Sequence, residues 1–184
     1  MAELLTDPEA PVRLAAVEAL TMSGAHSNAA LLLFKLRVGD KEPLITLACM
    51  SGLLSLAPEW ALTVLKPLLF SADESLRELA ALSLGESRQE ASLALLLENL
   101  GDTVLSRERA IVLRAIGLHR SERALQTLLT IISEGSALDA RLAVEALGVR
   151  RFETGIQEKA YEAAQKNEKV SLSETLTRAF PPEF

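Results

Sequence analysis

One spacing recurs along this chain: small apolar residues stand about 32 positions apart. The anchors are separated by 32, 32, 32 and 31 residues and are Ala16, Ala48, Ala80, Val112 and Ala143. Four residues after each anchor a second set repeats, namely Leu20, Gly52, Leu84, Ile116 and Leu147. A fixed period of 20–50 residues is the signature of stacked supersecondary units, so the chain must be built from one unit used several times.

The second half of each unit repeats as well. Apolar residues recur with the spacing i, i+3, i+4, i+7 at Ala29, Leu32, Leu33 and Leu36, at Ala61, Val64, Leu65 and Leu68, at Leu93, Leu96, Leu97 and Leu100, and at Leu125, Leu128, Leu129 and Ile132. This spacing is one face of an α-helix. Each unit is therefore predicted to be a pair of helices.

The predicted fold is all-α: a right-handed α-solenoid of five helix pairs closed by a C-terminal capping helix, forming a single domain over 1–184. The first helices are expected at 9–22, 42–56, 73–85, 105–118 and 137–149, and the second helices at 27–38, 59–70, 88–100, 121–133 and 153–166. The repeats are 7–39, 40–71, 72–103, 104–135 and 136–167, with the cap at 168–184.

Helix ends carry their own signals. Candidate N-caps, whose side-chain oxygens accept from free helix N–H groups, are Asp7, Asp40, Asp73, Ser106 and Ser136. Glycines stand where three of the first helices should stop, at Gly85, Gly117 and Gly148. Pro67 is expected to kink its helix.

The two ends of the chain differ. Ser171 and Glu174 form a capping-box pattern for a last helix, whose inner face would carry Leu172, Leu176 and Phe180. At the other end, 3–7 resembles the close of a second helix. We therefore expect either a segment cut from a longer array or an abbreviated N-terminal cap.

Composition supports helices. Hydrophobic residues make up 49% of the sequence but aromatic residues only 4%, a mixture that favours helix packing over a sheet. No apolar run approaches the roughly 20 residues of a membrane span. The single cysteine, Cys49, and the absence of a signal peptide favour a cytoplasmic protein. Residues 1–104 carry a net charge of −7 and residues 105–184 a net +1, which disfavours nucleic acid as a partner.

Local motifs give a family resemblance. Asp7-Pro8, Val12-Arg13, Ala16-Val17 and Ala19-Leu20 resemble the first helix of the short bacterial HEAT-like repeats, the type also found in phycobilisome lyases. The pattern returns around Arg77 and again at 143–148, and is weakest in the second repeat, where Ile45 replaces the arginine. The resemblance implies protein–protein binding without indicating the partner. Tetratricopeptide and ankyrin repeats fit less well because their turn and aromatic motifs are missing.

Catalytic patterns are absent from the sequence. His26 and His119 fall in predicted turns and are interpreted as solvated, while Cys49 is interpreted as a buried small apolar residue. No HExxH, paired cysteines, P-loop or GxSxG occurs, so we expect neither an enzyme nor a cofactor or metal. Arginines cluster in the fourth repeat, where Arg109 occupies the same repeat position as Arg13 and Arg77 and is expected to bond between units.

What remains is a binding surface. In such stacks the second helices usually line the concave side. The predicted partner-binding residues are Phe34, Leu62, Lys66, Leu69, Glu98, Thr130 and Tyr161. The first two repeats would receive an apolar segment of a protein partner; alternatively, these side chains pack between repeats. Two functions stay open: a non-catalytic scaffold or adaptor, and an accessory subunit of an enzyme such as a bilin lyase.

Overall fold

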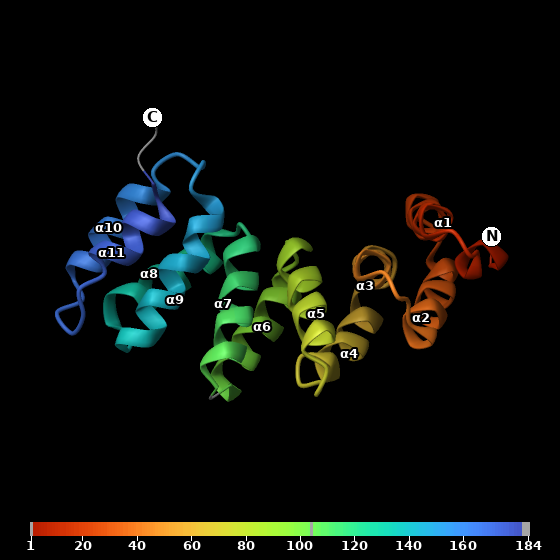
Figure 1. The fold of residues 1–184 in the computed structure, drawn as a ribbon, viewed down its shortest axis with the longest axis horizontal. Helices are drawn as coiled ribbons and strands as arrows, with labels where there is room; N and C mark the ends of the chain where they lie inside the picture. Colours follow the sequence, from red (N-terminus) through yellow and green to blue (C-terminus); the bar gives the residue numbers. More distant parts are fainter. Residues whose placement is uncertain (1, 104, 182–184) are drawn as a thin grey trace. The chain divides into compact units, whose positions relative to one another are not determined.

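The computed structural model describes residues 2–103 and 105–181, and within these ranges it contains helices and no strand. The chain's contacts divide it into two compact units, residues 1–87 and residues 88–184 (Figure 1). The boundary falls inside the predicted third repeat. No helix in the described ranges is both long enough and apolar enough to cross a membrane.

The first unit contains five α-helices and two short 3₁₀ turns. They are η1 (Glu3–Thr6), α1 (Ala10–Met22), η2 (His26–Asn28), α2 (Ala29–Val38), α3 (Pro43–Leu56), α4 (Pro58–Leu68) and α5 (Glu74–Glu86). The first helices of successive pairs stack on one another, α1 on α3 and α3 on α5. Each second helix packs against its own partner or the next first helix, so α3 lies in contact with α1, α2, α4 and α5.

The second unit repeats this packing scheme. Its elements are α6 (Glu90–Asp102), α7 (Ser106–Leu118), α8 (Glu122–Glu134), α9 (Ala137–Leu147), η3 (Gly148–Arg150), α10 (Ile156–Gln165) and α11 (Ser173–Ala179). α7 stacks on α9 and α9 on α11, while α6 packs on α7 and α8 on α9. The all-helical fold and each of the predicted helices are therefore present in the described residues, with helix ends shifted by at most three residues.

Periodic apolar positions form the two cores. Four of the five anchors are buried, and Ala48 is half-buried. The second helices contribute the buried residues Leu32, Leu65, Leu96 and Leu128. The stripe is only half-buried at three places in the first unit, Leu36, Val64 and Leu68. These three residues lie together, as described below.

A recurring arginine ties the end of one helix pair to the next. Arg13, Arg77 and Arg109 each donate through Nη1 to the backbone carbonyl six residues earlier, that of Asp7, Ser71 and Thr103 respectively. Arg13 and Arg109 also bond a carboxylate of the following repeat, at 2.7 Å from Nε to Asp40 and to Asp139. The predicted structural role of Arg109 is thus confirmed.

Asp40 lies at a buried junction of charges. It accepts from Nε and Nη2 of Arg13 at 2.7 and 2.8 Å, from the backbone N–H of Glu42 at 3.0 Å, and lies 2.7 Å from Lys35 Nζ. Only 3% of the Asp40 side chain and 5% of the Lys35 side chain are exposed. The bond from Arg13 in particular holds the pKa of Asp40 well below its ordinary value. An ammonium group this deeply buried requires its carboxylate.

The first helices end within one residue of the predicted glycines, and Gly148 is the C-cap of α9, but Gly117 and Gly148 also pack closely against neighbouring segments. Gly117 and Gly148 have negative φ, and left-handed backbone instead occurs at Gly24, Arg88 and Arg120, with φ of 68°, 56° and 51°. These three turn residues are themselves 64 and 32 positions apart. A Cβ on Gly117 would overlap the carbonyl oxygen of Ala146, and one on Gly148 would lie 3.1 Å from the Ala179 Cβ.

Several predicted caps need correction. Asp73 and Ser136 cap α5 and α9 as expected, and Asp7 and Asp40 bond the N–H two residues later. Ser106 makes no cap, because α7 begins at Ser106 itself and its N-cap is Leu105. Ser171 also makes none: its hydroxyl bonds Ser173 instead, and Leu172 stands at the N-cap of α11.

The C-terminal helix covers the last first-type helix. Leu172, Leu176 and Phe180 are 3–4% exposed, as predicted for the inner face of a cap, and α11 packs on α9. Residues 182–184 of the predicted cap lie outside the described residues. Pro67 lies inside α4, one residue before its end, and because it has no N–H it cannot donate to the carbonyl four residues earlier.

Removing the carboxylate of Asp40 should destabilise the first unit strongly. We expect Asp40→Ala to lower the free energy of unfolding by about 3 kcal/mol, because Lys35 would stay buried without a counter-ion. The pKa of Asp40 is depressed in the folded state, so its contribution is complete above about pH 4 and is lost as the pH falls through the folded pKa. Denaturant titrations between pH 2 and 7 measure both effects.

Asp139→Ala is the matched control for that variant. Asp139 and Arg109 are 22% and 21% exposed, so the same deletion should cost only about 1 kcal/mol. Equal losses in the two variants would contradict the importance assigned to burial at Asp40.

Gly117→Ala tests the close approach of α7 to α9. The added methyl group would meet the backbone of Ala146, which cannot yield without separating the helices, so we expect a loss of about 1–3 kcal/mol. Gly101→Ala is its control, because a Cβ there meets nothing within 4 Å; this variant should gain about 0.5–1 kcal/mol from helix propensity. Thermal or chemical denaturation gives the sign of each change.

Candidate functional site

A groove of about 480 Å³ opens on the first unit between its two second-type helices. α2 and α4 make few contacts with each other, whereas the corresponding helices α8 and α10 of the second unit pack directly. The groove is lined by Leu33, Leu36, Arg37, Trp60, Thr63, Val64, Pro67, Leu68 and Leu76. The separation of α2 and α4 therefore leaves part of the predicted apolar stripe open.

Helical spacing brings the lining residues together. On α4 they stand at i, i+3, i+4, i+7 and i+8, starting from Trp60, which places all of them on one face of that helix. On α2 they stand at i, i+3 and i+4, starting from Leu33. The walls are thus two helical faces, and Leu76 of α5 completes the lining.

Apolar surface dominates this groove. Leu33 is 6% exposed, while Leu36, Val64 and Leu68 are half-buried. Trp60 is 38% exposed, although tryptophan is highly buried on average. The hydroxyl of Thr63 donates to the carbonyl of Trp60 at 2.7 Å, so its proton is already used within α4.

Among the described residues that line the groove, Arg37 is the one that carries a charge. Its side chain is exposed and forms no ion pair with any residue in the described ranges. The surrounding unit is acidic, because residues 1–87 contain six Lys/Arg and eleven Asp/Glu, a net of −5. A free guanidinium beside an apolar groove favours a partner that brings a carboxylate.

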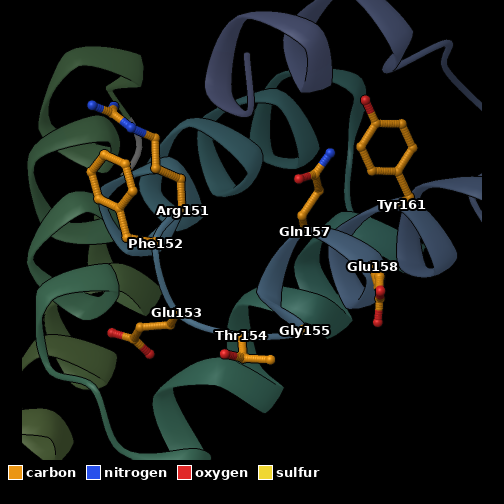
Figure 2. A pocket seen from close by; sticks show the side chains of 8 residues that line it. All are labelled: Arg151, Phe152, Glu153, Thr154, Gly155, Gln157, Glu158 and Tyr161. Atoms are coloured by element: carbon orange, nitrogen blue, oxygen red, sulfur yellow. The ribbon is translucent and has the colours of Figure 1, made fainter. Parts of the chain in front are cut away.

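A second hollow, of about 680 Å³, lies on the second unit between the loop 151–155 and α10 (Figure 2). It is lined by Arg151, Phe152, Glu153, Thr154, Gly155, Gln157, Glu158 and Tyr161. Figure 2 shows Arg151 and Phe152 together on one side and Gln157 and Tyr161 on the other. The Arg151 guanidinium lies 4.6 Å from the centre of the Phe152 ring, and Phe152 is 81% exposed.

The loop beside this hollow is anchored from beneath. Arg150 is 7% exposed and donates through Nε and Nη2 to Glu153, at 3.0 and 2.7 Å. Gly155 then takes a left-handed conformation, with φ of 77°, immediately before α10. The fork of Arg150 thus fixes a short loop that holds an aromatic ring out in solvent.

The predicted partner-binding residues are distributed differently from these hollows. Phe34, Lys66, Glu98 and Thr130 are exposed, and Phe34 reaches 56%. Leu62 and Tyr161 are half-buried, and Tyr161 lines the second hollow. Leu69 is 6% exposed and belongs to the core, because α4 ends at Leu68 and helical spacing no longer predicts which way Leu69 points. None of the predicted residues lines the groove of the first unit.

The groove residues that sequence reasoning overlooked are Arg37, Trp60, Thr63, Pro67 and Leu76. A usable signal was present: Trp60 stands four residues before Val64, on the edge of the apolar stripe. A tryptophan at that position widens the apolar face beyond what one neighbouring helix can cover. The sequence shows this width but not the gap between α2 and α4.

The sequence matches no family model and no curated protein.

The histidine interpretations are half right. His26 is exposed in η2, as predicted. His119 is 1% exposed, which contradicts the prediction of a solvated residue. Its Nε2 lies 3.0 Å from the carbonyl oxygen of Gln89 and its Nδ1 lies 2.9 Å from Ser121 Oγ. Because a carbonyl only accepts, Nε2 carries a proton, and in the neutral tautomer that this requires Nδ1 accepts from the serine hydroxyl. His119 thus bonds two turns of the second unit together.

Cys49 is buried, as predicted, and burial raises the pKa of its thiol to about 12. Such a thiol stays protonated near neutral pH and is not a nucleophile. In the described ranges, no group of three or more His, Cys, Asp or Glu side chains is placed to hold a metal ion.

Glu153→Ala tests whether the loop in Figure 2 is held by its ion pair. The variant leaves Arg150 buried without a carboxylate, and we expect the free energy of unfolding to fall by about 2 kcal/mol. Phe152→Ala on the same loop should change it by less than about 0.5 kcal/mol, because the ring is exposed. Denaturant titration of both variants distinguishes an anchored loop from a loose one, in which the two losses would be alike.

Proposed function

We propose that this chain is a non-catalytic protein-interaction module of the HEAT-like solenoid class. The supporting observations are the 32-residue period and the same stacking of first-type helices in each unit. The observation that carries the binding function is the groove between α2 and α4, with its half-buried leucines and exposed Trp60. Aromatic and arginine side chains, such as the Trp60 and Arg37 that line this depression, are typical of the residues that dominate binding energy in protein interfaces.

The chemistry of the groove favours a protein over a small metabolite. Its walls are mainly side chains of two helices, and the described lining residues include one charged group and no cluster of polar donors to fix a small ligand. The acidic unit around it also disfavours a phosphate backbone. A partner surface with apolar side chains fits these properties.

Selection from a displayed library of random 16-residue peptides tests this function. Against the immobilised full chain we expect enrichment of a small set of related sequences with micromolar dissociation constants. Binding of a synthetic peptide from that set should shift the fluorescence of Trp60, the only tryptophan in the chain. Enrichment no greater than against an unrelated helical protein would contradict the proposal.

A further inference from the structure

We infer that the groove between α2 and α4 takes the apolar face of an amphipathic α-helix that places a carboxylate against Arg37. This inference rests on the proposed function and specifies the partner's chemistry. Three properties of the groove lead to it: the nature of its walls, its length, and the position of its charge.

The walls determine the partner's backbone conformation. Both are helices, so their N–H and C=O groups are used within α2 and α4, and the described ranges contain no strand edge to pair with. An extended peptide laid in this groove would lose water from its backbone without gaining hydrogen bonds. A helix satisfies its own backbone and presents only side chains, which makes it the favoured occupant.

The length of the groove determines how much helix it holds. Its wall on α4 extends from Trp60 to Leu68, which corresponds to about 12 Å of helix axis at 1.5 Å per residue. About two turns of a partner helix match that length. Apolar residues at i, i+3 or i+4, and i+7 of the partner would then face Leu36, Val64 and Leu68.

Arg37 determines the partner's polar requirement. It is exposed at the wall formed by α2, and its guanidinium can present two parallel N–H donors to one carboxylate. A lysine in its place would offer a point charge and lose this geometry. The net negative charge of the rest of the unit opposes acidic helices elsewhere on its surface, which favours this one position.

The test uses one selected 16-residue peptide and two derivatives of it. In the first derivative the acidic residue is changed to Lys, and in the second one leucine that faces the groove is changed to Asp. We expect the selected sequences to share apolar residues at helical spacing and one acidic residue, and the peptide to become helical by circular dichroism on binding. In the Arg37→Glu variant the affinity for the acidic peptide should fall at least tenfold. This variant should also bind the lysine derivative more tightly than the acidic peptide. The Arg37→Lys variant should bind the acidic peptide with about threefold lower affinity.

Lys41→Glu is the matched control, because it makes the same change of charge at an exposed residue that does not line the groove. It should change the affinity less than twofold. Leu36→Asp should abolish binding, and circular dichroism melting identifies any variant that has lost its fold. Trp60→Phe should remove the fluorescence signal while calorimetry still detects binding.

The outcomes separate this inference from the proposed function. If peptides are selected but Arg37→Glu and Lys41→Glu affect them equally, or if the bound peptide stays extended, the inference is overturned while the module still binds proteins. If no peptide is selected, the proposed function itself fails.

Discussion

The guanidinium of the repeat arginine is the contact on which successive helix pairs depend. It bonds a carbonyl at the end of the preceding segment, where helix termini leave acceptors without donors, and in two of three cases a carboxylate of the next repeat. Arg13 and Arg109 thereby link their own helix to the segment before it and to the repeat after it. The apolar anchors supply the burial that favours stacking, and in the three pairs that carry it the arginine bonds the start of its helix to the segment before it.

The first unit extends this contact into a buried charge cluster. Lys35 joins Arg13 at Asp40, so two cations share one carboxylate beneath the surface. Asp40 precedes α3, the helix that contacts every other helix of the unit. A cluster that forms only when α1, α2 and the start of α3 are in place helps to specify one arrangement of those three segments, although burial makes it costly.

Much of the fold could be predicted from the sequence, because helix periodicity and the 32-residue repeat report directly on burial. Caps and stops were less predictable. Gly117 follows the rule for a helix stop in sequence, yet its role is to admit the backbone of Ala146, which depends on a neighbouring helix. His119 was misjudged for the same reason: its acceptor is the carbonyl of Gln89, thirty residues earlier.

The candidate site was even harder to predict from the sequence. The sequence placed an apolar surface on the second helices of the first two repeats, and the structure contains a groove there. Its lining differs from the predicted residues because α2 and α4 stand apart, so that Val64 and Leu68 of the apolar stripe line the groove whereas Leu62 and Leu69 do not. The gap between two helices depends on how both pack on α3, and no local pattern reports that.

The burial of Cys49 has a practical consequence for how this chain can be followed in solution. It is the only cysteine in the sequence and lies in α3, which packs on the other α-helices of the first unit. Its thiol is buried, and burial keeps it protonated. A thiol reagent can reach it only when α3 detaches from its neighbours, so the rate of labelling reports the opening of residues 1–87 alone. Together with Trp60, the unmodified chain thus carries two natural probes of one half, and the other half is silent to both.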